Sequence, residues 1–166
     1  KKIGLLSIDI DGNDYWILKE ITAVDPSLVV CEYNSMFGDM HKIASVYDKN
    51  FDRSKKHHTN LYFGASIKAM IDMMNEKGYF FLGTNSTGLN KYFLKKELCK
   101  YLENNIKHKH SFPTTAREGL DLDGKLTFDS IEKNIKKIQH LDVFDIEEDK
   151  LKNISDYNNL YSDRWK

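Results

Sequence analysis

The chain has 166 residues, enough for one well-cored domain or for a domain with a helical extension. Lysine and arginine together number 25, as do aspartate and glutamate, and this neutral balance gives no support for a nucleic-acid or anionic-membrane partner. No apolar run reaches the roughly 18–20 residues that span a bilayer, and no signal peptide is recognisable, so the sequence favours a cytoplasmic protein.

A strand–helix–strand unit is predicted at the start of the chain. Residues 3–10 are nearly all apolar, which is typical of a strand buried on both faces of a parallel sheet. Asp14 is expected to cap the next helix, whose apolar residues follow helical spacing. Residues 28–33 form a second apolar strand. A unit of this length predicts two parallel strands joined by a right-handed crossover.

The next part of the chain adds a long loop, a helix and a hairpin. Residues 35–63 lack a clean period and are expected to cross the carboxyl edge of the sheet, where substrate loops usually lie. The segment 64–66 opens a helix that should stop at Gly78. Residues 79–83 and 91–95 are predicted strands, and the short loop between them requires antiparallel neighbours.

These elements predict an α/β fold with two parallel strands plus an antiparallel hairpin in residues 1–96. Residues 97–166 are expected to form a mainly helical extension, with helices over 97–106 and from a capping-box-like start at Asp129 and Glu132. The strand at 3–10 would lie at a sheet edge. An exposed apolar edge invites pairing, so we expect a homodimer, or cover from the tail or from a missing amino-terminal half.

Acidic side chains follow both predicted parallel strands. Asp9 and Asp11, and likewise Glu32 and Asn34, are two residues apart and should point the same way at strand ends about 4.8 Å apart. Ligands bind at this edge of an α/β sheet. Oxygen atoms are the ligands that magnesium prefers, which makes Asp9, Glu32 and Asn34 candidate metal ligands. The alternative is that these residues cap helices or form a tight turn at Gly12 without a metal.

The string at residues 7–15 resembles the fourth-strand motif of class I S-adenosylmethionine-dependent methyltransferases. It is similar to FkbM-type methyltransferases, whose Asp-x-Glu-Gly sequence is matched here by Asp9, Asp11 and Gly12. The strand–helix–strand–helix order followed by an antiparallel hairpin is the second half of that fold, which is Rossmann-like. With the stretch 62–66 before a helix, the resemblance extends over residues 3 to about 96.

The same string resembles the Asp-x-Asp-x-Asp-x-Tyr stretch of divalent-metal O-methyltransferases acting on catechols and caffeoyl esters. Those enzymes follow the next strand with adjacent Asp-Asn metal ligands. Here Tyr33 separates Glu32 from Asn34, so the chain departs from that pattern.

The resemblance implies the carboxyl half of a methyltransferase that uses S-adenosylmethionine and O-methylates a small polar or glycan-type acceptor. The family's glycine-rich loop and its ribose-binding acid are not in this chain, so alone it should bind the cofactor poorly. Asp9 and Asp11 would contact cofactor and acceptor as the catalytic residues. The acceptor pocket would be completed by Tyr33, Asn34, Tyr62 and His41.

Three other functions fit parts of the pattern. In a haloacid-dehalogenase-like magnesium phosphatase, Asp9 would be the nucleophile and Asp11 the general acid/base, although that family expects Thr or Val where Asn13 stands. The Asp-x-Asp sequence also serves manganese-dependent nucleotide-sugar glycosyltransferases. A non-catalytic binding module is the third alternative. The sequence encoded upstream would discriminate, because a methyltransferase needs a strand ending in a glycine-rich loop there.

Overall fold

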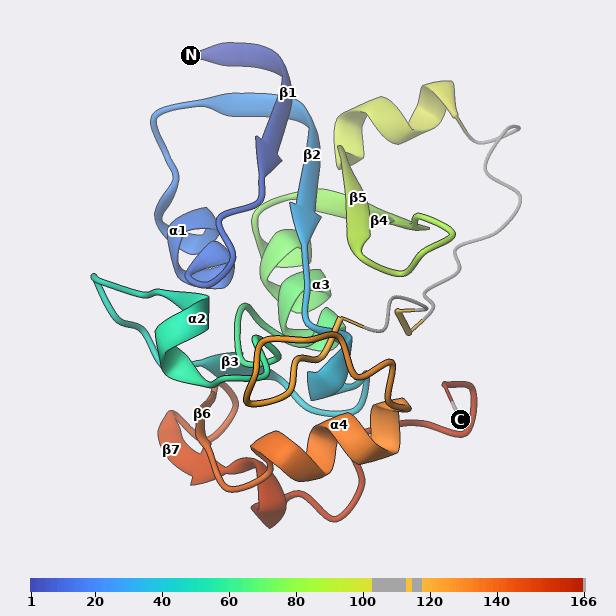
Figure 1. Cartoon of the computed structure of the whole chain (residues 1–166). Coiled ribbons are helices and arrows are strands. Elements are labelled where there is room, and N and C mark those ends of the chain that lie inside the picture. Colours follow the sequence, from blue (N-terminus) through green and yellow to red (C-terminus); the bar gives the residue numbers. More distant parts are fainter. Residues whose placement is uncertain (103–112, 115–117, 166) are drawn as a thin grey trace.

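The computed structural model describes residues 1–102, 113–114 and 118–165 and contains two sheets (Figure 1). The main sheet has four strands in the order β1-β2-β5-β4. In that order the strands span Lys2–Ile8, Asp25–Glu32, Asn90–Lys95 and Tyr79–Thr84. β1 and β2 are parallel, whereas β5 is antiparallel to both of its neighbours. The predicted α/β class, with a parallel pair and an antiparallel hairpin in one sheet, is confirmed.

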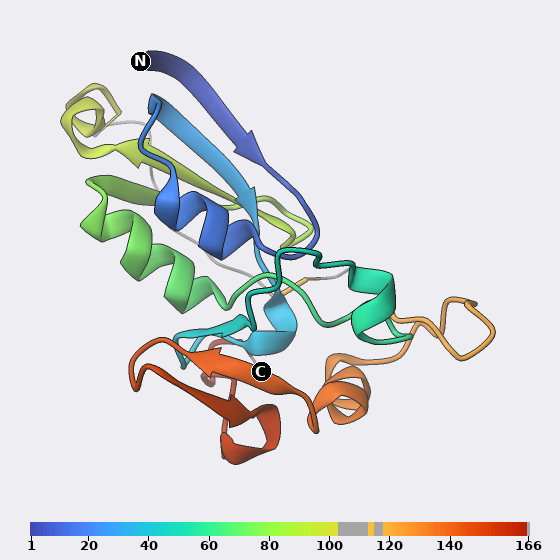
Figure 2. The same ribbon diagram turned by 90° about the vertical axis from the view of Figure 1, so that its left-hand side faces the viewer.

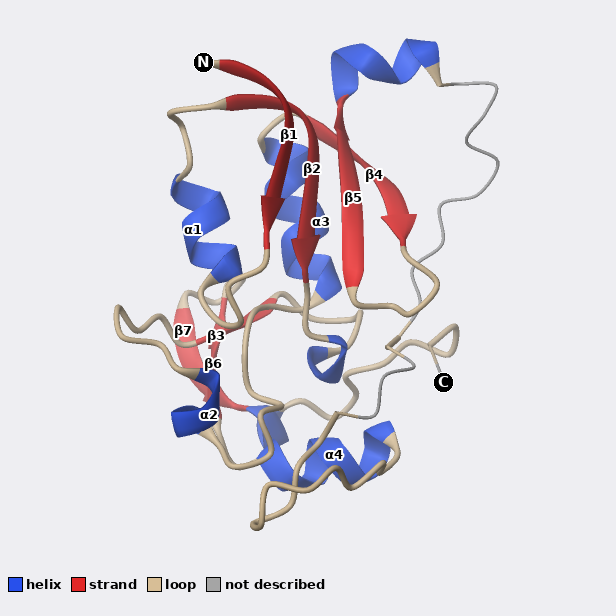
Figure 3. Cartoon of the chain, turned by 45° about the horizontal axis from the view of Figure 1, so that its top comes forward, coloured by secondary structure: helices blue, strands red, loops and turns tan. Residues whose placement is uncertain are grey.

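Two helices cover one face of the main sheet (Figures 2 and 3). α1 (Asp14–Glu20) joins β1 to β2, and α3 (Ile67–Glu76) precedes the hairpin. Their buried faces pack on side chains that alternate along the strands. This core layer includes Ile8, Val29, Cys31, Tyr79 and Phe93 from the sheet, and Tyr15, Leu18, Ala69, Met70, Met73 and Met74 from the helices.

β1 is an edge strand, as predicted, but it is not buried on both faces, contrary to the sequence-based prediction. Alternation turns Leu6 and Ile8 toward the helices, while Leu5 on the opposite face is 55% exposed. Within the described ranges β1 pairs with β2 alone, and no strand of the tail pairs with its outer edge. In the same ranges no helix is long and apolar enough to cross a membrane.

The start and end of α3 follow the sequence signals. The Ser66 hydroxyl accepts a hydrogen bond from the Ala69 amide at 3.2 Å, which satisfies one of the free N–H groups of the first turn. The helix ends just before Gly78, whose φ of +88° places it in the left-handed region that favours glycine.

Asp14 does not cap α1, so that prediction was wrong. Asn13 occupies the N-cap position and makes no side-chain cap bond. The buried Asp14 carboxylate instead accepts hydrogen bonds from the amides of Ile10 at 3.1 Å and Gly12 at 2.9 Å. Because Asp14 lies one residue inside the helix, its side chain reaches back and holds the turn that links β1 to α1.

The second sheet combines the long loop with the tail. The loop contains the 3₁₀ turn η1 (Ser35–Phe37), the strand β3 (Ile43–Ser45) and the short helix α2 (Arg53–Lys56). β3 pairs with β6 (Asp142–Asp145), which pairs with β7 (Lys150–Asn153). The described residues after 97 thus contain two strands that the sequence did not predict, and β6 joins them to β3 of the loop.

The tail also carries shorter helical elements. α4 (Ile131–Ile138) begins after Ser130, which accepts from the Lys133 amide at 3.5 Å, so the cap lies one residue after the predicted Asp129. η2 (Lys96–Tyr101) and η3 (Ile154–Asp156) are 3₁₀ turns. The helix predicted over 97–106 is 3₁₀ in its described part, and its end lies outside the described residues.

Candidate functional site

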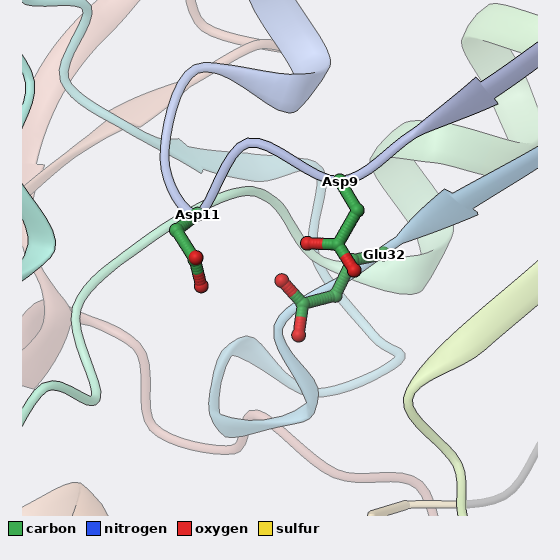
Figure 4. Close-up of side chains that lie close together, drawn as sticks. All are labelled: Asp9, Asp11 and Glu32. Atoms are coloured by element: carbon green, nitrogen blue, oxygen red, sulfur yellow. The ribbon is translucent and has the colours of Figure 1, made fainter.

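Three carboxylates meet at the carboxyl ends of β1 and β2. Asp9 and Asp11 follow β1, and Glu32 is the last residue of β2. One oxygen from each lies within 4.8 Å of the other two, and Figure 4 shows Asp9 and Glu32 side by side with Asp11 facing them. The convergence of Asp9, Asp11 and Glu32 follows from the parallel pairing, which places the two strand ends at the same edge.

The protein environment opposes ionisation of two of these groups. Glu32 is only 9% exposed; burial, followed by the charge of Asp9, raises its pKa from 4.5 to about 8. Its Oε2 atom has no hydrogen-bond partner among the described residues. Partial burial and the nearby charges of Asp11 and Asp14 also raise the pKa of Asp9. The cluster therefore holds a proton, or attracts another cation, near neutral pH.

Arg53 supplies a positive charge at the rim of the cluster. It begins α2, where the side chain of Asp52 caps the helix by accepting from the Ser54 amide. The guanidinium donates to Asp11 at 2.7 Å and lies over the Phe63 ring, 3.8 Å from its centroid. Sequence reasoning placed this loop over the sheet edge but missed Arg53, although it is the only arginine in residues 35–63.

Asn34 serves the loop backbone. Its side chain is 2% exposed, and Nδ2 donates to the carbonyls of Leu61 at 2.8 Å and Phe63 at 3.0 Å. Its Oδ1 accepts from the Met36 amide at 2.9 Å. These three hydrogen bonds occupy both polar side-chain atoms of Asn34, Nδ2 and Oδ1. They favour a structural role over the predicted one as a metal ligand or acceptor contact.

Tyr62 and His41, predicted to bind the acceptor, face the second sheet. The Tyr62 hydroxyl donates to the Asp142 carbonyl at 2.6 Å and accepts from the Val46 amide at 3.0 Å. The His41 Nε2 lies 2.8 Å from the carbonyl oxygen of Asn159. Both residues therefore tie the loop to the tail, and neither contacts the three carboxylates.

Tyr33 follows Glu32 but is buried in a small core of its own with Ile67 and Trp165. The Nζ atom of Lys91 lies 4.7 Å from the centre of its ring and donates to the Glu32 backbone carbonyl at 2.8 Å. Lys91 is fully buried, and this burial lowers its pKa to about 8. Lys91 thus holds the end of β2 through its contacts with Glu32 and Tyr33. Lys91 was not predicted from the sequence.

Comparison of the chain with protein-family models, with curated proteins and with solved structures gives no match. The features of the chain that bear on its function are the geometry of the carboxylate cluster and the order of the elements.

Proposed function

We propose that this chain is the carboxyl half of a Rossmann-like, S-adenosylmethionine-dependent methyltransferase domain that acts in the cytoplasm on a small polar or glycan-type hydroxyl. The observation that carries the proposal is the sheet order β1-β2-β5-β4. It unites a parallel strand–helix–strand unit with an antiparallel hairpin, which is the element order of the second half of that fold. Among the described residues β1 pairs with β2 alone, so an amino-terminal half could add its strands along the other edge of β1 (Figure 3).

The chemistry available at the cluster suits methyl transfer to oxygen. The cofactor would supply a methyl group on a sulfonium, and the protein must hold an acceptor hydroxyl in line with it. Asp9 and Asp11 are exposed at the end of β1 and can accept hydrogen bonds from such a hydroxyl. Glu32, with its pKa raised to about 8, accepts the hydroxyl proton only in its ionised form, and the fraction of that form grows as pH rises through neutral toward 8.

The test uses the protein encoded by the complete reading frame, assayed for S-adenosylhomocysteine release with polar and glycan-type acceptors. Asp9→Asn should lower the rate by about 100-fold or more if the carboxylate positions the acceptor. The matched control is Asp123→Asn, in the exposed turn closed by the bond from Gly124 to Asp121, and it should keep full activity.

Two results would refute the proposal. One is equal turnover by wild type and Asp9→Asn. The other is magnesium-dependent hydrolysis of an aryl phosphate without S-adenosylmethionine. The second result would favour the phosphatase alternative, with Asp9 as nucleophile and Asp11 as general acid/base.

A further inference from the structure

The carboxylate cluster contains a buried atom that nothing in the described part of the chain satisfies. Glu32 is nine-tenths buried, and its Oε2 atom lacks a hydrogen-bond partner. Figure 4 shows its carboxyl group beside that of Asp9, on the side that faces Asp11. Buried carboxylates in proteins are normally paired with a positive group or coordinate a metal. The position of Glu32 therefore points to a missing positive partner.

Neighbouring cations do not fill this role. Arg53 forms ion pairs with Asp11 at 2.7 Å and with Glu118 at 3.3 Å. Lys91 directs its ammonium group to the backbone carbonyl of Glu32. In the described residues neither cation has an ion pair with the Glu32 carboxylate, so three acids face one shared guanidinium. The cluster keeps an excess of negative charge.

The frame that carries the three acids is rigid. Asp9 and Glu32 extend from paired parallel strands, whose register matches Ile8 with Cys31. Asp11 sits in a turn with φ of +54°, and Asp14 holds that turn through the Gly12 amide at 2.9 Å. A preformed set of oxygens on sheet ends and a fixed turn loses little freedom when it binds an ion.

The spacing of the oxygens suits a hard divalent ion. Ligand oxygens lie about 2.0–2.6 Å from magnesium or calcium, so two ligands on opposite sides of the ion are separated by about 4–5 Å. The three carboxylates meet this requirement, since their closest oxygens lie within 4.8 Å of one another.

We propose that Asp9, Asp11 and Glu32 form a binding site for one divalent cation of the magnesium or calcium type. Asp11 replaces Asn34 in the ligand set expected from the sequence, because the Asn34 amide is bonded to the loop. The remaining coordination positions are open to water or to an acceptor hydroxyl. This inference rests on side-chain geometry and goes beyond the proposed methyl transfer.

The experiment is a calorimetric titration of MgCl₂, CaCl₂ and MnCl₂ into the EDTA-treated protein encoded by the complete reading frame, without S-adenosylmethionine. At least one of these ions should bind at a single site with a Kd of about 10–1000 μM. A hundredfold excess over that Kd should raise Tm by about 5–10 °C. Because no cofactor is present, this result is independent of whether the protein transfers methyl groups.

Two variants make the result specific. Glu32→Gln should weaken binding at least about tenfold while its Tm in EDTA stays at or above that of wild type. Asp9→Asn provides the same test if Glu32→Gln fails to fold. The control variant is Glu97→Gln, which replaces an exposed acid at the start of η2 and should bind the ion like wild type. The proposal is overturned if none of the three ions gives saturable heat, or if Glu32→Gln or Asp9→Asn binds as tightly as wild type.

Discussion

Replacing Asn34 with alanine should destabilise the protein strongly. The change removes three buried hydrogen bonds, which leaves the carbonyls of Leu61 and Phe63 and the amide of Met36 without partners. Each unpaired buried group costs about 1–3 kcal/mol, and local relaxation recovers part of this, so we expect a loss of about 3 kcal/mol. For a domain of this size that corresponds to a decrease in Tm of about 6–12 °C.

Urea unfolding followed by circular dichroism measures this loss in EDTA. Asn34→Asp should be at least as destabilising, because it turns the two N–H donors into an oxygen that faces two carbonyl oxygens. Asn158→Ala, at an exposed position in the tail, is the matched control and should change stability by no more than about 0.5 kcal/mol. A loss below about 1 kcal/mol in Asn34→Ala, together with lost cation binding, would show that Asn34 is a ligand and refute the structural role.

Three further predictions concern neighbouring groups. Tyr62→Phe should cost about 1–3 kcal/mol in urea unfolding, since it removes the bonds to the Asp142 carbonyl and the Val46 amide; an unchanged midpoint would contradict these contacts. In EDTA, stability should decrease as pH rises from about 4.5 to about 8, because the raised pKa of Glu32 makes the folded state hold a proton that the unfolded state has released. Glu32→Gln should flatten this slope, and an equal slope in the variant would argue against the raised pKa. Asp9→Asn should shift stability by less than about 1 kcal/mol, and a larger thermal loss would mean that Asp9 holds the turn.

The main sheet could be predicted because its signals are local. Two apolar stretches separated by a helical pattern define the parallel pair, and the short loop after residue 84 defines the hairpin. The second sheet could not be predicted in this way. β6 reads Asp-Val-Phe-Asp and β7 reads Lys-Leu-Lys-Asn, so neither has a strand pattern strong enough to recognise. β6 pairs with β3, which lies far earlier in the chain, and β7 pairs with β6.

The candidate site was predictable for the residues whose positions the strands determine. Asp9, Asp11 and Glu32 converge because parallel pairing brings the strand ends together. Asn34 lies only two residues further, but its partners are backbone carbonyls 27 and 29 residues along the chain, which no local pattern reveals. Arg53 lies in the loop, 42 residues from Asp11 in the sequence, so no local pattern reveals their contact either.

The proposed methyltransferase role is tested most directly by calorimetric titration of S-adenosylhomocysteine into the protein encoded by the complete reading frame. We predict saturable binding at one site, weakened at least about tenfold, or about 1.4 kcal/mol, by Asp9→Asn and unchanged by Asp123→Asn. Absence of saturable binding, or equal affinity in wild type and Asp9→Asn, would contradict the contact between Asp9 and the cofactor that the resemblance implies.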